Sequence, residues 1–110
     1  MKDMIVIDIA KNYTRTPGGR SISDGEYSGE DFRERILYPN YLRAVEMKEK
    51  IQVNLDGCYG FPSCFLEEAF GGLVRKADER ASKVIKRFKF ISVEDAYVIK
   101  QIKKYMKEAK

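Results

Sequence analysis

The chain has 110 residues, of which 44% are hydrophobic and 35% charged, a composition that suits one globular core but not two independent ones. The sequence has no apolar run of the ~20 residues that a membrane span needs and no recognisable signal peptide. We therefore expect a single cytoplasmic domain over residues 1–110. The chain has no histidine, which excludes the commonest general base and every Ser-His or Cys-His nucleophile pair, so we expect no enzyme. Its two cysteines are too few for a structural zinc site, so we expect no metal, and we expect no cofactor either.

The formal net charge of +4 is unevenly distributed. Residues 1–74 hold 9 basic and 12 acidic side chains, whereas residues 75–110 hold 12 basic and 5 acidic ones. A basic C-terminal third can contact nucleic acid, an anionic membrane surface or an acidic protein. A lysine-rich terminal helix is more often only a solvated face, so the charge alone does not assign a partner.

The N-terminal residues predict a β-hairpin. Residues 5–10 are rich in β-branched side chains and predict a first strand. Pro17-Gly18-Gly19 predicts a turn, and residues 20–23 are long enough for a short return strand that pairs with the first.

A helix is predicted to begin at Ser28, because a hydroxyl followed by the Asp31 carboxylate three residues later has the form of a capping box. Pro39 should stop or kink this helix, since proline cannot donate a backbone hydrogen bond. A second helical segment is predicted over residues 40–50, with three side chains facing inward: Tyr41, Leu42 and Val45.

Four further elements complete the expected fold. Residues 51–55 alternate apolar and polar side chains, which indicates a strand with one buried face. A helix is predicted from Ser63 or Cys64 to about Glu79, and a strand over residues 84–91. Ser92 begins a second capping form ahead of a final amphipathic helix. The order ββ-α-β-α-β-α predicts an α/β domain with a small mixed, mostly parallel four-stranded sheet covered by helices.

The loop between residues 55 and 63 is the strongest candidate site, because ligands and partners of α/β sheets meet loops at the carboxyl ends of parallel strands. Its Gly57 and Gly60 match neither the P-loop nor the dinucleotide-binding pattern. Ser63 has two interpretations: a helix N-cap, or a phosphorylation site that switches partner docking.

The two cysteines and the residues after them have ordinary interpretations. Cys58 and Cys64 fit small buried hydrophobic positions better than a redox pair, although a thiol at a helix N-terminus can gain reactivity. Glu67 and Glu68 fit the polar side of the helix near its positive end. Gly71-Gly72 costs a helix ~1 kcal/mol per glycine, so we expect a close approach either to the sheet or to a neighbouring chain.

Several segments together resemble the STAS-like domains of unknown function, which are related to the STAS fold of anti-anti-sigma factors. The resemblance extends over essentially the whole chain and rests on Gly19-Arg20, Ser28-Gly29-Glu30-Asp31-Phe32-Arg33, Val53-Asn54-Leu55-Asp56-Gly57, and Ser63 with Phe65-Leu66-Glu67-Glu68-Ala69-Phe70-Gly71-Gly72-Leu73-Val74-Arg75. It implies a STAS-like domain that regulates by partner switching and docks on a GHKL-type ATPase kinase or a similar protein. In the STAS pattern the second of two serines at the helix start is the usual phosphate acceptor, and here that position is Cys64.

The leading hypothesis is therefore a non-enzymatic regulatory protein-binding module, with a homodimer left open. Its expected partner-contacting residues are Gly60, Ser63, Cys64, Glu67, Glu68, Gly71, Gly72 and Arg75, with Ser63 as the possible phosphorylation site. The alternative is a small nucleic-acid-binding protein whose final helix contacts phosphates through Lys100, Lys103, Lys104 and Lys107. An enzyme would need Asp56, Glu67 or Cys64 to act without histidine.

Overall fold

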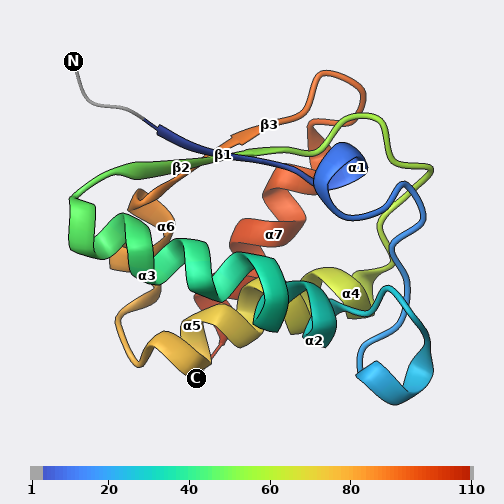
Figure 1. Cartoon of the computed structure of the whole chain (residues 1–110), viewed down its shortest axis with the longest axis horizontal. Helices are drawn as coiled ribbons and strands as arrows, with labels where there is room; N and C mark the ends of the chain where they lie inside the picture. The colour runs from blue at the N-terminus through green and yellow to red at the C-terminus, as the bar shows by residue number, and fades with distance from the viewer. Residues whose placement is uncertain (1–3, 110) are drawn as a thin grey trace.

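A three-stranded parallel sheet forms one layer of the computed structural model, which describes residues 4–109 (Figure 1). Its strands β1 (Met4–Asp8), β2 (Lys50–Asn54) and β3 (Phe88–Ile91) lie in that order, with Ile5 opposite Ile51 and Val53 opposite Phe90. The predicted α/β class and parallel pairing are confirmed. The predicted four-stranded sheet is not, because residues 4–109 contribute three strands.

The hairpin prediction was wrong. Residues 20–23 form no strand, and after the short helix α1 (Ile9–Asn12) the chain reaches a 3₁₀ turn, η1 (Ile22–Asp24). The backbone of this segment bonds to the next one instead of to β1: Gly18 N donates to Tyr27 O at 3.0 Å, and Gly29 N donates to Gly19 O at 3.0 Å. The loop therefore satisfies its own hydrogen bonds and leaves the outer edge of β1 without a return strand.

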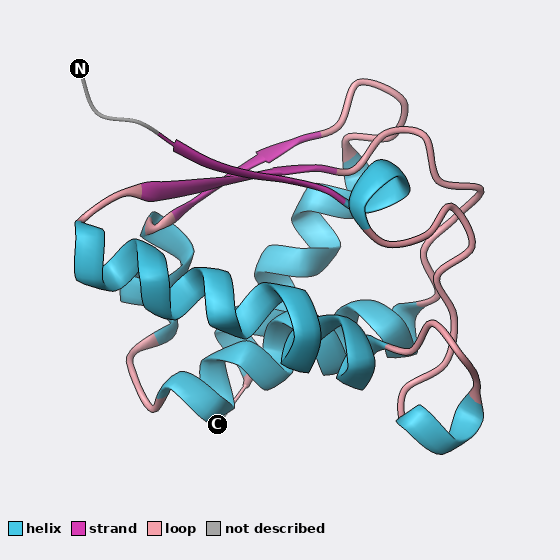
Figure 2. Cartoon of the chain, viewed as in Figure 1, coloured by secondary structure: helices cyan, strands magenta, loops and turns pink. Residues whose placement is uncertain are grey.

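Helices α2 to α7 lie on one side of the sheet, as Figure 2 shows. Ile7 on β1 and Ile51 and Val53 on β2 point toward these helices and are buried. On the opposite face Val6 is 54% exposed and Lys89 is also exposed, so no helix of the described chain covers it. This arrangement is uncommon, since parallel sheets are usually covered on both faces.

One helical run connects β1 to β2. It consists of α2 (Gly29–Phe32), a π-helical turn η2 (Arg33–Leu37) and α3 (Tyr38–Met47). Ser28 caps it as predicted, because its Oγ accepts from Asp31 N at 3.0 Å. Of the two expected effects of Pro39, a stop or a kink, the stop was wrong, because the helix continues into α3: the wide π turn just before Pro39 opens the helix where the proline ring would otherwise clash.

The inward face of α3 was only partly predicted. Tyr41 is buried as expected, and it lies four residues after the buried Leu37 and three before the buried Ala44. Leu42 and Val45 are 49% and 43% exposed, so their predicted inward orientation was wrong. Leu42 follows the buried Tyr41 and Val45 follows the buried Ala44, and a step of one residue along a helix rotates a side chain by about 100°, so both point toward solvent.

A second helical run connects β2 to β3. Its parts are α4 (Ser63–Leu66), a π-helical turn η3 (Glu67–Gly71), α5 (Gly72–Ala77) and α6 (Ala81–Lys86). The helix predicted from Ser63 is therefore confirmed and ends near Ala77. The strand predicted over residues 84–91 was half wrong, because Val84 is buried within α6 and β3 starts at Phe88.

The final helix, α7 (Tyr97–Glu108), packs against the second run and buries Val98, Ile102 and Met106 as its periodicity predicted. Ser92 Oγ accepts from Asp95 N at 3.1 Å, but this turn precedes the helix rather than beginning it. None of the helices within residues 4–109 combines the length and apolar character that crossing a bilayer requires.

Candidate functional site

The loop after β2 is fixed at its base by Asp56. The Asp56 carboxylate accepts hydrogen bonds from Val93 N and Glu94 N, both at 2.9 Å, and Glu94 Oε1 accepts in turn from Gly57 N at 2.9 Å. The backbone hydrogen bonds from Val93 and Glu94 lower the pKa of Asp56. Gly57 has a φ of 94°, where a side chain would be strained. Asp56 therefore joins the loops after β2 and β3.

The tip of this loop projects into solvent. Tyr59 is 83% exposed although its backbone N–H is held by Arg15 O at 2.9 Å, and Gly60 and Ser63 are exposed. Ser63 is the first residue of α4 and Pro62 occupies the N-cap, so the N-cap interpretation of Ser63 was wrong. Within residues 4–109 the Ser63 hydroxyl makes no hydrogen bond and faces solvent. The loop therefore presents an aromatic ring and a hydroxyl.

The cysteines are both free and half-buried. Cys58 Sγ donates to Thr14 O at 3.4 Å, and burial, together with nearby Asp8, raises the pKa of the Cys58 thiol to about 11. Cys58 is therefore a neutral thiol near pH 7, with little nucleophilic character. Cys64 lies in the first turn of α4, beside Ser63.

Glu67 and Glu68 are engaged in ion pairs within the chain. Glu67 pairs with Arg75 at 2.8 Å and also with Arg20, whose guanidinium reaches Glu68 at 3.3 Å. Arg20 belongs to the loop before α2, so these pairs fasten that loop onto η3. The carboxylates are half-buried and directed at cations of their own chain.

The glycine pair makes room for Arg33. The Arg33 guanidinium lies against Gly72, so that a side chain at position 72 would overlap it, and it donates to both the Glu68 carboxylate and Glu68 O at 2.7 Å. A Cβ at Gly71 would lie 2.9 Å from Glu67 Oε2 and 3.3 Å from Tyr105 O. The two glycines therefore allow other helices of the same chain to pack closely against this helix. The expectation that they approach the sheet or a second chain was wrong.

The ion pairs continue beyond Arg33. Arg33 Nε donates to Glu34 at 2.9 Å, and Glu34 accepts from Lys76 at 2.5 Å. Alternating charges thus run across the contact between the two helical runs. We call this set the ion-pair network; its members are Arg20, Arg33, Glu34, Glu67, Glu68, Arg75 and Lys76.

The ion-pair network predicts a loss of stability at acid pH. Lys76 and then Arg33 lower the pKa of Glu34, and Arg75 lowers the pKa of Glu67, both from an ordinary 4.5. Carboxylates with a lowered folded-state pKa contribute stability that is complete above the unfolded-state value and is lost as pH falls through the folded-state value. We therefore expect the free energy of unfolding to drop between about pH 5 and about pH 3.

Urea unfolding followed by circular dichroism at several pH values would measure this drop. Glu67→Gln provides the matched control, because it removes one of the two titrating groups and should flatten the dependence. A wild-type profile that stays level over this range, or one that Glu67→Gln leaves unchanged, would contradict the prediction.

The sequence identified the loop after β2 as a candidate site, but it did not single out Tyr59 and Arg33 as site residues. Tyr59 could have been noticed as a large aromatic between glycines in a loop. Arg33 carried no local signal, because its role comes from contact with residues 35 and 39 positions away. The predicted site residues thus divide: Gly60, Ser63 and Cys64 lie at the loop tip, while Glu67, Glu68, Gly71, Gly72 and Arg75 lie in or against the ion-pair network.

The comparisons with known proteins give one finding on the family. The family model described as a STAS-like domain of unknown function (DUF4325) matches residues 28–98, from the cap of α2 to the first turn of α7. No curated protein and no solved structure matches the chain. The matched segment exceeds half of the 110 residues and contains both helical runs and the loop after β2. The chain therefore belongs to the STAS-like domain family of unknown function.

Proposed function

We propose that the chain is a cytoplasmic, non-enzymatic regulatory module that binds a protein partner of the GHKL-type ATPase kinase class, in the manner of STAS partner-switching proteins. The observation that carries this proposal is the segment from Tyr59 to Ser63, in which every residue except the half-buried Phe61 is exposed and which the hydrogen bonds of Asp56 and Tyr59 N hold at the carboxyl end of β2. Family membership supports a regulatory interaction module in general terms. The partner and the switching are our inference.

The docking surface that we propose consists of Tyr59, Gly60, Ser63 and Cys64. A tyrosine that is 83% exposed supplies a rigid aromatic anchor with a polar tip, and such side chains are enriched among the residues that dominate interface energies. The buried or ion-paired residues Glu67, Glu68, Gly71, Gly72 and Arg75 support this surface from behind. Their role is to set the position of the helix that follows the loop.

Phosphorylation of Ser63 is the proposed switch. The hydroxyl is exposed, and a phosphate would place a charge of about −1.5 to −2 in the middle of the docking surface. Burying that charge against a partner costs desolvation energy, so phosphorylation is expected to release the partner. Cys64 cannot accept a phosphate in the serine manner, which leaves Ser63 as the acceptor in this chain.

The test is affinity capture with the intact chain, followed by binding measurements with the purified ATPase that it recovers. Tyr59→Ala and Ser63→Glu should each weaken the complex by about tenfold or more, because both alter the centre of the docking surface. Leu42→Ala is the matched control, since Leu42 is 49% exposed on α3 and should leave affinity unchanged. Recovery of no such ATPase, or equal affinities for all three variants, would refute the proposal.

A further inference from the structure

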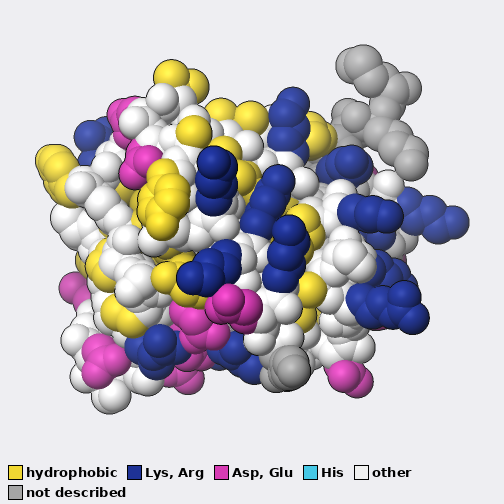
Figure 3. Space-filling view, turned by 180° about the vertical axis from the view of Figure 1, so that it is seen from behind, with side chains coloured by type: hydrophobic (Ala, Val, Ile, Leu, Met, Phe, Trp, Pro, Cys, Tyr) yellow, Lys and Arg dark blue, Asp and Glu magenta, His cyan; other side chains and the backbone are white. Residues whose placement is uncertain are grey.

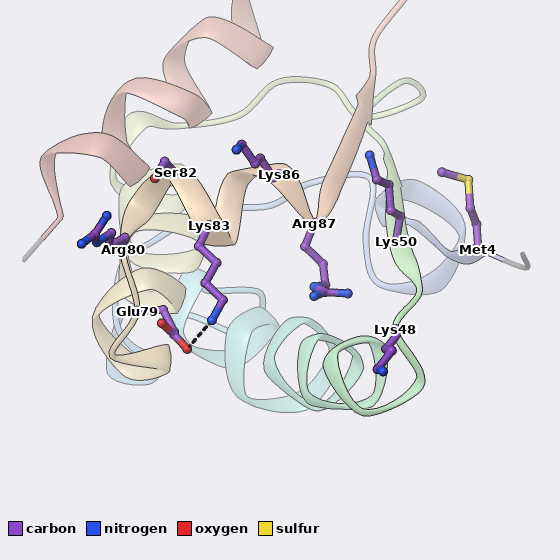
Figure 4. A pocket seen from close by; sticks show the side chains of 9 residues that line it. All are labelled: Met4, Lys48, Lys50, Glu79, Arg80, Ser82, Lys83, Lys86 and Arg87. Atoms are coloured by element: carbon purple, nitrogen blue, oxygen red, sulfur yellow. Dashed lines mark hydrogen bonds and ion pairs between the residues drawn. The ribbon is translucent and has the colours of Figure 1, made fainter.

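A basic groove of about 940 Å³ lies at the amino ends of β1 and β2, between the end of α3 and α6 (Figure 4). Figure 4 shows that its side chains come from these separate elements. One carboxylate, Glu79, is among them. The remaining lining consists of Met4, Ser82 and six cations: Lys48, Lys50, Arg80, Lys83, Lys86 and Arg87.

Two of the six cations already have partners. Lys83 pairs with Glu79 at 3.1 Å, and the Arg87 guanidinium donates to Glu49 O at 2.8 Å, near the end of α3. The other four, Lys48, Lys50, Arg80 and Lys86, have no carboxylate within ion-pair distance among residues 4–109. A hollow lined mainly by one sign of charge, here six cations against one carboxylate, concentrates the electrostatic potential and attracts anions.

A second set of cations adjoins the groove. A shallow depression on α7, which packs beside α6, is lined by four lysines and one carboxylate: Lys100, Lys103, Lys104, Lys107 and Glu108. At about 100° per residue these four lysines share one side of the helix, opposite the buried Ile102 and Met106. Figure 3 shows Lys and Arg side chains gathered across this side of the molecule.

An exposed aromatic ring lies at the start of the same helix. Tyr97 is 64% exposed and precedes Lys100 by three positions and Lys104 by seven, so it borders the lysine stripe. Cations that follow a phosphate backbone, combined with an aromatic side chain that stacks on a base, are the means by which proteins hold nucleic acid without reading its sequence.

We propose that the basic groove and the α7 lysines form one continuous site for the phosphate backbone of a nucleic acid. Two cation sets on adjoining elements suit an extended polyanion better than a single small anion. The hollow shape of the groove disfavours a flat bilayer, and Tyr97 favours nucleic acid over an acidic protein. The site differs from the docking surface after β2, and it includes groove residues that the pattern of α7 alone did not indicate.

The test is fluorescence anisotropy of the intact chain with a labelled oligonucleotide of about 20 nucleotides, offered as a single strand and as a duplex over a range of salt concentrations. We expect binding to weaken linearly in log salt. For the single strand, each phosphate contact contributes about 0.7 to the slope. The double variant Lys86→Gln/Lys104→Gln should therefore reduce the slope by about 1.4 and weaken binding by about tenfold or more at moderate salt.

Lys11→Gln is the matched control, because Lys11 is exposed on α1, beyond the opposite end of β1. It should leave the slope and the affinity close to wild type. Absence of binding to either oligonucleotide at low salt would overturn the proposal, as would an equal effect of Lys11→Gln. Displacement by polyglutamate as efficiently as by unlabelled oligonucleotide, or binding only to phosphatidylserine vesicles, would also overturn it and identify an acidic protein or a membrane instead.

Discussion

Replacing Phe70 with alanine is expected to lower the free energy of unfolding by about 3–5 kcal/mol, the largest effect that we predict. Phe70 is fully buried, with its ring centroid 6.2 Å from that of Phe32 and 5.7 Å from that of Phe90. It thus connects the second helical run to both the first run and β3. Its removal leaves a cavity that three elements would have to close.

Because a domain of this size is stabilised by about 5–15 kcal/mol, such a loss is a large share of the total. Urea denaturation followed by circular dichroism measures it, with Tyr59→Ala as the matched control, since that ring is 83% exposed and should cost little. If Phe70→Ala does not fold, Phe70→Leu should show a loss of about 1–2 kcal/mol. Wild-type stability in the leucine variant would contradict the packing described.

Gly29→Ala is expected to destabilise the protein by about 2–3 kcal/mol. A Cβ at position 29 would lie 2.5 Å from Phe65 O, 3.0 Å from Glu68 Cβ and 3.1 Å from Ala69 N. Two of these atoms belong to the backbone of the second helical run, so they cannot move without shifting that run. The start of α2 would have to separate from α4 and weaken the contact that the ion-pair network bridges.

Gly18→Ala is the matched control for this prediction, because a Cβ there meets no heavy atom of the described chain within 4 Å. The same denaturation measurement applies to both variants. An equal, small effect of the two substitutions would show that the helices separate at little cost and would contradict the close crossing at Gly29.

The elements that the sequence predicted well are those with a sustained period. Residues 51–55 alternate apolar and polar side chains and form β2, and α7 repeats its apolar residues at helical spacing. In both segments the local pattern alone is enough to identify the type of secondary structure. Residues 20–23 and 84–87 are too short for a period. Their structures depend on tertiary contacts, such as the hydrogen bond from Glu30 N to Arg20 O and the burial of Val84.

In the candidate site, too, the features with a local sequence signal were predicted and those that depend on distant contacts were missed. A general rule, that loops at the carboxyl ends of parallel strands carry function, identified residues 55–63 from the strand before them. The glycine pair was recognised as unusual, but its neighbour Arg33 comes from another helix and could not be read from local spacing. The groove was missed for a related reason: Lys86 lies 36 residues after Lys50, and the two come to the same end of the sheet only when β2 pairs with β3.

Strand β2 separates the docking surface from the basic groove along one rigid element. Lys50 at its first residue lines the basic groove, and the loop with Tyr59 begins just after its last, Asn54. Five residues of extended chain span about 16 Å, so a ligand in the groove lies well away from a partner at the loop. The α7 end of the nucleic-acid site lies closer to the loop, because Glu94, three residues before Tyr97, accepts a hydrogen bond from Gly57 N. If both proposals hold, a protein partner at the loop and a nucleic acid in the groove are expected to form a ternary complex, in which the two ligands come nearest to each other beside Tyr97.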